Sequence, residues 1–326
     1  GCELAQAFSR LGCRVTILQR APHLLGREDE DAIRFLHDAF SREGIRVVLD
    51  AVPRRVSGPG PKVIEYDAGG AAQSLEADEI LVGVGRAPNV ENLGLEEAGV
   101  AYDTKKGIRV DDHLRTTNPR IYAAGDVCLP YKFTHMADAT ARLILRNAFF
   151  PGNARVSALT VPWVTYTDPE IAHVGMYARD AQRKGIAVET FVKPLAEVDR
   201  AILDGETEGF VKVMVARGSD RILGATIVAR HAGEMINEIT LAVAHGIGLK
   251  ALSALIHPYP TQAEAIKATA DSYNRGRLTP FAKRLFSFRF DLDRSESLAS
   301  VREYARRAMD FLSEAINSIR NTQRRK

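Results

Sequence analysis

Asp126 is the carboxylate in this chain whose setting points most directly to binding chemistry. It follows the segment IYAAG, which has the pattern of a buried strand, and a tight turn at Gly125. A carboxylate at such a turn can accept hydrogen bonds from sugar hydroxyls, and a glycine lets another backbone approach closely. Asp126 is therefore either a ligand for a sugar-bearing cofactor or simply the cap of the helix that follows.

A second candidate site lies at the end of the apolar segment RVTILQ (residues 14–19), a predicted strand. A dinucleotide-binding fold that selects NAD usually carries Asp or Glu here, which accepts a hydrogen bond from the ribose 2′-hydroxyl. This chain has Gln19 and Arg20 instead, with Arg27 one loop further on. Because a guanidinium pairs well with phosphate, we predict NADP(H) as the cofactor. The alternative is that Arg20 is a solvated surface arginine and the cofactor is NAD(H).

The elements that must position this site form half of a βαβ unit. A helix is predicted over residues 1–11, ending at Gly12, and the strand 14–19 follows it. The last glycine of a G-x-G-x-x-G motif lies in the first turn of such a helix, where it permits close packing on a strand, and Gly1 fits that place. The helix has no cap and no strand before it, so we expect the chain to begin inside its own nucleotide-binding motif.

The remaining pattern predicts a parallel core with a small antiparallel addition, followed from about Ser157 by an α+β block. In the first part, strands are expected at 45–49, 55–56, 63–66, 79–84, 107–110 and 120–124, and helices at 28–43 and 138–150. In the second part, strands are expected at 161–166, 188–194, 210–216 and 222–228, and helices at 233–245, 249–255 and 261–273.

The composition allows a large core but gives no general attraction to nucleic acid or to membranes. The 326 residues are 45% hydrophobic with a formal net charge of +3, so we expect two or more domains and no nucleic-acid partner. Three scattered cysteines (Cys2, Cys13 and Cys128) indicate a reducing, cytoplasmic setting. Their spacing matches no metal-binding or redox motif, so we predict no metal site. No apolar run approaches the ~20 residues of a membrane span.

Five segments, in this order and spacing, resemble the pyridine nucleotide–disulfide oxidoreductases, which include dihydrolipoamide dehydrogenase, glutathione reductase and mercuric reductase. They are GCELAQAF (1–8), LVGVGRAPN (81–89), TTNPRIYAAGDV (116–127), VTYTDPEIAHVG (164–175) and HPYPTQAEA (257–265). The resemblance extends to about Arg275.

The resemblance implies an α/β fold class, with partial doubly wound, Rossmann-like FAD- and NAD(P)-binding domains, an α+β dimerisation domain and a C-terminal helical tail. The expected divisions are residues 1–84 for the NAD(P)-binding domain, 85–156 for the returning part of the FAD-binding domain, 157–275 for the dimerisation domain and 276–326 for the tail. The family's first FAD strand and its redox C-x-x-x-x-C pair would precede residue 1, and we therefore expect this chain alone to be inactive.

The resemblance also implies roles for individual residues. The family's Asp at the position of Asp126 holds the ribityl chain of the flavin, and this favours cofactor binding over capping; Gly85 and Arg86 are further candidate cofactor-binding residues. The Glu that matches Glu3 lies near the nicotinamide and flavin rings. Alternatively, Glu3 only complements the dipole of its helix.

Tyr259 and Glu264 mark the expected acceptor site. Disulfide reductases of the family have His-Pro-Thr here, and a Glu five residues after the His orients it as the acid–base for thiol chemistry. This chain has Glu264 at that spacing but Tyr259 in place of the His. His257 is a further candidate, although a shift of two residues changes where a side chain points. A phenol with a pKa of ~10 is a poor proton shuttle at neutral pH.

Mercuric reductases and soluble transhydrogenases resemble this chain in having Tyr at that place, where a phenol oxygen would help to position or transfer Hg(II). The alternative for Tyr259 is packing at an interface with a partner for its hydroxyl. The resemblance thus predicts a homodimeric FAD enzyme, nearest to mercuric reductase-like members, that passes electrons from NADPH to a disulfide or metal-thiolate acceptor. Two alternatives stay open: a flavin transhydrogenase or diaphorase without a cysteine pair, and a chain that only dimerises.

The tail differs in composition from the rest of the chain. Residues 276–290 (GRLTPFAKRLFSFRF) combine basic and aromatic residues without an acid, and apolar residues at helical spacing follow. Such a segment can contact a membrane surface. We favour the alternative, a helix folded over the body of the protein or over its dimer partner.

Overall fold

The computed structural model describes residues 1–277, 283–284, 286–287 and 306. Most of the expected tail, including its membrane-surface segment and amphipathic helix, lies outside these residues. Residues 1–271 form one compact unit, and the description below concerns that unit and helix α8, which runs out of it. In the described part of the chain, no helix is long and apolar enough to cross a membrane.

The first part of the chain contains the predicted half of a βαβ unit. Helix α1 (Cys2–Arg10) leads to strand β1 (Thr16–Leu18), and helix α2 (Glu30–Arg42) leads to strand β2 (Arg46–Val48). The two strands pair in parallel, with Ile17 opposite Val47. The carboxylate of Asp29 caps α2 by accepting a hydrogen bond from the backbone N–H of Asp31, so this helix begins two residues later than predicted.

The predicted antiparallel addition is a three-stranded sheet in the order β3-β4-β5. Its strands are β3 (Val52–Ser57), β4 (Lys62–Ala68) and β5 (Ala71–Ala77). The turn from β3 to β4 requires a glycine, because Gly58 has a φ of 107° and a Cβ there would lie 2.7 Å from the carbonyl oxygen of Pro61. The second turn consists of Gly69 and Gly70, both with positive φ.

Two of the predicted strands, 79–84 and 120–124, are not strands in the structure. The first is an extended segment in which Val82 and Val84 are 73% and 91% exposed. The second has only an isolated bridge between Arg115 and Tyr122. Both segments have β-branched and apolar residues of the right kind, but a strand also needs a neighbouring strand to pair with. Within the described residues neither segment has one.

The middle of the chain consists mainly of loops around one long helix. It contains the short strands β6 (Tyr102–Asp103) and β7 (Gly107–Ile108), the 3-10 turn η1 (Gly125–Val127) and helix α3 (Thr134–Phe149). Helix α3 begins four residues before the predicted start at Asp138. Its first residue follows the extended Phe133 directly, without a side-chain cap, so the sequence carries no capping signal at the true start.

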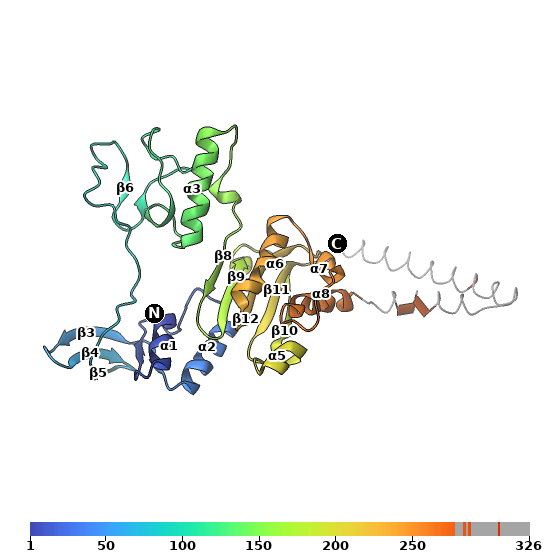
Figure 1. Cartoon of the computed structure of the whole chain (residues 1–326), viewed down its shortest axis with the longest axis horizontal. Helices are drawn as coiled ribbons and strands as arrows, with labels where there is room; N and C mark the ends of the chain where they lie inside the picture. The colour runs from blue at the N-terminus through green and yellow to red at the C-terminus, as the bar shows by residue number, and fades with distance from the viewer. Residues whose placement is uncertain (278–282, 285, 288–305, 307–326) are drawn as a thin grey trace. The chain divides into compact units, whose positions relative to one another are not determined.

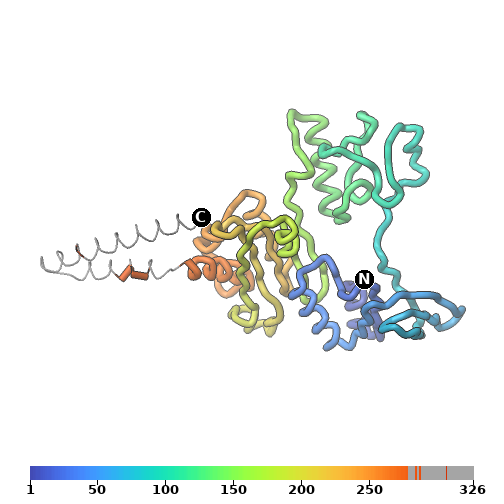
Figure 2. Tube along the Cα trace, turned by 180° about the vertical axis from the view of Figure 1, so that it is seen from behind, coloured from blue at the N-terminus to red at the C-terminus, as the bar shows by residue number. Residues whose placement is uncertain are grey.

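The last part of the unit is built on a five-stranded antiparallel sheet in the order β10-β11-β12-β9-β8 (Figure 1). Its strands are β8 (Pro162–Thr165), β9 (Glu170–Gly175), β10 (Val188–Pro194), β11 (Phe210–Ala216) and β12 (Ile222–Ala229). The helices of this part are α4 (Ala178–Arg183), α5 (Asp199–Asp204), α6 (Ala232–Ala244), α7 (Leu249–Ala254) and α8 (Glu264–Gly276). Figure 2 shows the same sheet from behind.

The sequence analysis missed three of these elements. Strand β9 has Glu and His among its residues and therefore does not read as a buried strand, although His173 is fully buried in it. Helices α4 and α5 have only six residues each, which is too short for a helical period to appear. Helix α8 begins at Glu264, three residues later than predicted.

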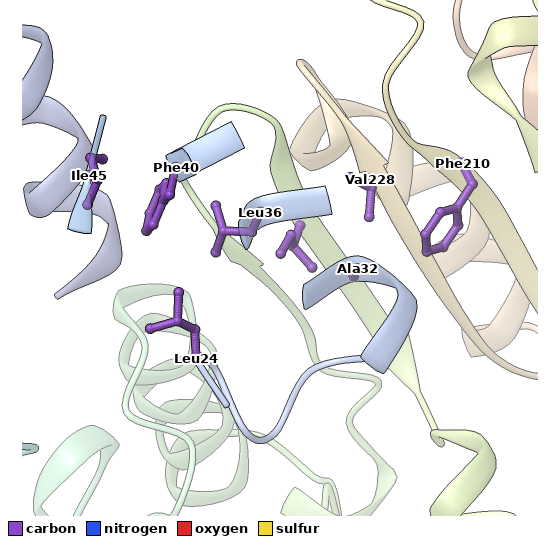
Figure 3. Packing of buried hydrophobic residues seen from close by; sticks show 8 residues of the cluster. Leu24, Ala32, Leu36, Phe40, Ile45, Phe210 and Val228 are labelled. Atoms are coloured by element: carbon purple, nitrogen blue, oxygen red, sulfur yellow. The ribbon is translucent and has the colours of Figure 1, made fainter. Parts of the chain in front are cut away.

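Helix α2 packs on the five-stranded sheet and so joins the first part of the chain to the last. Leu36 and Phe40 on its buried face belong to one cluster with Val228 of β12 (Figure 3). The other buried members of the cluster are Leu24, Ala32, Ile45, Ile171 and Phe210. Because the loop before α2 carries the candidate nucleotide-binding residues, the sheet helps to determine where that loop lies.

Candidate functional site

The candidate flavin-binding residues lie together in one open pocket of about 380 Å³. Arg86 and Asp126 come from segments forty residues apart, and their side chains approach within 3.4 Å (Nη1 to Oδ2). Arg86 is largely exposed and Asp126 is half-buried, so this long ion pair contributes little stability and leaves the carboxylate oxygens free to accept other hydrogen bonds. The lining residues are Arg86, Ala87, Pro88, Asn89, Asp126, Val127 and Lys132.

Gly125 fits the prediction of a close backbone approach. Its φ is 72°, and a Cβ at this position would lie 2.8 Å from the Cβ of Ala137 on α3. The backbone N–H of Gly125 also donates to the hydroxyl of Thr140, which is buried and in turn donates to the carbonyl of Met136. The turn is thus fixed against the first turns of α3, and this places Asp126 at the pocket.

A second pocket, of about 480 Å³, lies where the start of α3, strand β8 and the start of α6 meet. Its wall combines the aromatic side chains of Trp163 and Tyr166 with the polar groups of His135 and Glu170. A carboxylate oxygen of Glu170 accepts a hydrogen bond from the backbone N–H of Gly233 at 2.8 Å, and this bond ties β9 to the N-terminus of α6. An aromatic pocket with a few polar groups is the kind of site that binds a small organic molecule.

Glu3 reaches the edge of this second pocket. Its Oε1 accepts a hydrogen bond from the backbone N–H of Tyr166 at 2.7 Å, so the carboxylate is placed by a residue of the pocket wall. On the next helical turn, the buried side chain of Gln6 both donates to the carbonyl of Asp168 and accepts from its N–H. These bonds hold α1 against the segment after β8, and the sequence analysis did not identify Gln6.

The predicted nucleotide-selecting residues lie in the loop of residues 19–29, between β1 and α2. The side chain of Gln19 donates to the carbonyl of His23 at 2.8 Å and so closes the loop internally. The side chains of Arg20 and Arg27 are exposed. Within the described residues Arg20 has no ion-pair partner, so its guanidinium is available to an anion.

Gly1 and Gly83 mark a close approach between α1 and the extended segment 79–84. A Cβ at Gly83 would lie 3.3 Å from the Cα of Gly1, whereas a Cβ at Gly1 would meet nothing within 4 Å. The glycine at which a side chain would be crowded in this structure is therefore Gly83, which the sequence analysis did not single out. The signal that could have identified it is the G-V-G spacing with Gly85.

Glu28 is a buried carboxylate that sequence reasoning also missed. It accepts hydrogen bonds from the hydroxyl of Tyr177 at 2.6 Å and from the indole N–H of Trp163 at 3.0 Å. Burial raises the pKa of Glu28, while these two hydrogen bonds act in the opposite direction. Burial also raises the pKa of Tyr177, with the charge of Glu28 as a further cause, so the phenol stays protonated and donates.

The predicted acceptor residues Tyr259, Glu264 and His257 form no hydrogen bonds with one another in the described structure. The hydroxyl of Tyr259 donates to Asp199 at 2.8 Å rather than to Glu264, and this bond raises the pKa of Tyr259; Glu264 acts on that pKa only through its charge. Nε2 of His257 lies 3.1 Å from Oε1 of Glu238. Its Nδ1 is buried without a hydrogen-bond partner among the described residues. The side chain of Tyr259 is 69% exposed.

The cysteines have no feature of a reactive pair. Burial raises the pKa of Cys128 to about 11 and also raises that of Cys2, so neither is a thiolate at neutral pH. Cys13 is exposed, and all three are free. Across the described ranges, no three His, Cys, Asp or Glu side chains gather in a way that could hold a metal ion.

Two family models match the chain, and they agree with this geometry. The model described as pyridine nucleotide-disulphide oxidoreductase matches residues 1–141, and the model of the family's dimerisation domain matches residues 161–270. The first match contains the Gly125–Asp126 turn and the nucleotide loop, and the second contains the five-stranded sheet. The chain belongs to the pyridine nucleotide-disulphide oxidoreductase family.

Curated relatives include mercuric reductases and dihydrolipoyl dehydrogenases. The chain is 37% identical to the mercuric reductase of Bacillus cereus over 276 residues, which is 84% of this chain and 44% of that protein. It is 35% identical to the mercuric reductase of Staphylococcus aureus, covering 84% of this chain and 50% of that protein. It is also 35% identical to the dihydrolipoyl dehydrogenase of Thermus scotoductus, covering 84% and 60%. The chain spans about half the length of the curated relatives it matches.

Two solved structures share the fold. The HOCl-induced flavoprotein disulfide reductase RclA from Escherichia coli superimposes with a TM-score of 0.76 at 27% identity, covering 83% of this chain and 62% of that one. The crystal structure of LpdA from Mycobacterium tuberculosis gives a TM-score of 0.77 at 29% identity, covering 83% and 59%. The α/β fold class inferred from the sequence is therefore confirmed.

Proposed function

We propose that this chain is part of a homodimeric, FAD-dependent oxidoreductase that takes electrons from NADPH and delivers them to a disulfide or metal-thiolate acceptor. The observation that carries the proposal is the pocket in which Arg86 and Asp126 meet beside the Gly125 turn. The identities of 35–37% to mercuric reductases and of 35% to a dihydrolipoyl dehydrogenase support the family alone, so the mercuric reductase-like branch is proposed on Tyr259. We assign residues 1–84, 85–156, 157–275 and 276–326 to the NAD(P), FAD, dimerisation and tail regions.

The residues present fit part of a flavin site. The carboxylate of Asp126 faces a polar pocket with lone pairs left over, as the hydroxyls of a ribityl chain would require. The left-handed turn at Gly125 brings the chain close to α3, where a side chain would clash. Arg86 and Lys132 add positive charge to the same pocket. When bound, FAD would supply the chemistry that relays electrons between nicotinamide and acceptor.

The nucleotide loop fits a phosphorylated ribose better than a free one. The end of β1 carries no carboxylate that could accept from a 2′-hydroxyl, and the exposed Arg20 and Arg27 provide cations for a 2′-phosphate. Glu3, held by the backbone of Tyr166 at the second pocket, would contact the nicotinamide end of the same cofactor. These contacts support NADP(H) over NAD(H).

Tyr259 is the proposed contact with the acceptor. Its exposed phenol and its bond to Asp199 leave it protonated at neutral pH, so it can donate a hydrogen bond but not act as a base. A phenol of this kind is suited to positioning a thiolate or a thiolate-bound metal once its single proton turns from Asp199 to the acceptor. The dimerisation-domain match supports a homodimer, and the three free, scattered cysteines support a cytoplasmic location.

The acceptor can be identified by steady-state kinetics with the full-length, flavin-loaded protein. We expect NADPH oxidation to be stimulated by Hg(II) in excess thiol or by a small disulfide, with a lower KM for NADPH than for NADH. Substitution of Tyr259 by phenylalanine should lower kcat with the acceptor while leaving flavin reduction by NADPH unchanged. A protein that retains no flavin under any purification condition would overturn the proposal.

A flavin transhydrogenase is the second candidate, and the tyrosine at position 259 favours it. Without a histidine at that place, the site lacks the acid–base group that thiol chemistry usually employs. Rapid hydride exchange between NADPH and thio-NAD⁺, together with no response to Hg(II) or to disulfides, would establish this second function in place of the first.

A further inference from the structure

The loop of residues 19–29 is held in part by the α+β block that begins near Ser157. The α+β block provides a side chain, Arg179 on helix α4, that bonds directly to the loop backbone. Its Nη1 donates to the carbonyl of Glu28 at 2.9 Å, and its Nη2 donates to the carbonyl of Arg27. One guanidinium thus fixes two successive peptide groups, one of which belongs to a proposed phosphate-binding residue.

Tyr177 holds both Arg179 and the loop. The guanidinium of Arg179 lies 4.4 Å from the centroid of the Tyr177 ring, which is a favourable cation–π contact. The hydroxyl of the same ring donates to the Glu28 carboxylate, and Trp163 donates to the other carboxylate oxygen. A buried carboxylate with two donors resists displacement, because loss of either bond leaves a buried charge unsatisfied.

The same, C-terminal end of the loop is also anchored to the five-stranded sheet. Lys212 on β11 forms an ion pair with Asp29 at 2.7 Å and a second one with Asp31. The side chains of Lys212 and Asp29 are each only 15% exposed, so solvent screens this pair less than a surface pair. The loop backbone is therefore fixed from residue 27 to the first turn of α2.

We propose that Arg179 and Tyr177 are positioning residues that set the preference for a 2′-phosphorylated nicotinamide nucleotide by fixing the backbone on which Arg27 stands and the loop that carries Arg20. The inference rests on the proposed function of this loop. Both arginines are long and exposed, so much of their affinity for phosphate is lost in ordering them. A rigid backbone removes part of that cost, and a guanidinium placed wrongly by about 1 Å loses its bidentate contacts with phosphate.

The test compares binding of 2′,5′-ADP with binding of 5′-ADP to the flavin-loaded, full-length protein by calorimetry. Arg179→Ala and Tyr177→Phe should each weaken 2′,5′-ADP binding by roughly fivefold to tenfold and leave 5′-ADP binding within about twofold. Tyr177→Phe removes only the hydroxyl and keeps the ring, so it tests the inference even if Arg179→Ala folds poorly.

Arg183→Ala is the matched control. Arg183 lies on the same helix and pairs with Asp180, so its loss changes the charge equally without touching the loop. If Arg179 has a purely structural role, Arg179→Ala should lower the melting temperature and weaken the binding of both nucleotides alike. That result would overturn the inference. Arg20→Ala separates the NADP(H) assignment from the positioning role of Arg179. If Arg20→Ala abolishes the preference for 2′,5′-ADP over 5′-ADP while Arg179→Ala does not, the NADP(H) assignment holds and the positioning role fails.

Discussion

At the scale of single residues, Arg20 is an exposed cation at the end of β1, and in the proposed function it is the residue that selects NADPH. We predict that Arg20→Ala raises the KM for NADPH by about tenfold and leaves that for NADH nearly unchanged, because a 2′-phosphate loses one charge-assisted contact. Steady-state kinetics with both nucleotides measures this. Arg14→Ala, which removes an exposed charge just before the same strand, should alter neither value.

His173 makes the stability of the protein sensitive to acid. Its Nε2 lies 3.2 Å from the carbonyl of Gly175, which can only accept, so this nitrogen carries the proton, and Nδ1 accepts from the hydroxyl of Thr226 at 2.8 Å. Burial lowers the pKa of His173 to about 4. Between pH 6.5 and 4 the unfolded chain therefore binds a proton that the folded chain excludes, and stability falls as the pH falls.

The expected loss from this histidine is about 2 kcal/mol of unfolding free energy between pH 7 and 5. The contribution of Glu28 to stability changes in the opposite direction as the pH falls, because its raised pKa lets the folded state bind a proton before the unfolded state does. We predict that His173→Gln, whose amide can keep one of the hydrogen bonds, loses clearly less stability over that interval than the parent protein. Urea unfolding at the two pH values measures the difference. Equal losses in both proteins would show that other groups control the acid response.

Sequence reasoning could select Asp126, Gly125 and Arg20 as candidate binding residues, because each stands at an informative place in a local pattern. It could not identify Glu28. The two donors to its carboxylate lie 135 and 149 residues away along the chain, and nothing in the local pattern GRED distinguishes it from a solvated acid. Burial of a charged group is a property of the tertiary fold, so a local pattern does not reveal it.

At the scale of elements, the turn into η1 has no room for one added methyl group. Gly125→Ala would place its Cβ 2.8 Å from that of Ala137 and would also force an L residue to a φ of 72°. We predict a loss of about 2–4 kcal/mol of stability and weakened flavin retention, because Asp126 must move with the turn. The measurements are the molar ratio of bound FAD after gel filtration and the melting temperature.

Gly44 provides a control with the same backbone strain but no clash. Its φ is 74°, and a Cβ there would meet nothing within 4 Å. Gly44→Ala should therefore cost only about 1 kcal/mol and leave flavin binding intact. Flavin loss from both variants alike would mean that strain, rather than the position of Asp126, explains the effect.

Strands were easier to predict where the partner strand follows directly along the chain than where it does not. Strands β3 and β4, which were predicted in part, have their partners next to them along the chain, and the turns contain the glycines that they need. Strand β5 (Ala71–Ala77) was not predicted, because its sequence AAQSLEA is weakly apolar. The segment 79–84 is more apolar than either flanking hairpin strand, but no neighbouring strand pairs with it in the described structure. The β-propensity of a segment shows that it would fit into a sheet, but not that a partner strand is present.

At the scale of the whole molecule, the nucleotide loop and the five-stranded sheet are stabilised by one hydrophobic cluster, which is centred on α2. Phe40 is fully buried between them, so Phe40→Ala should lower the free energy of unfolding by about 3–5 kcal/mol. Because one cluster joins both regions, near-ultraviolet circular dichroism and hydrogen exchange of the loop should report the same destabilisation. His37→Ala, on the exposed face of the same helix, should change the stability by less than about 1 kcal/mol.

Trp163 is the single tryptophan of the chain, and it donates its indole N–H to Glu28. The tryptophan fluorescence of the chain therefore comes from one ring located where β8 contacts the nucleotide loop, 4.7 Å from the ring of His173. Any event that separates the loop from the sheet must change the polarity around that indole and the wavelength of its emission. The protein thus carries a built-in optical reporter of this junction, which can be read in real time without a label.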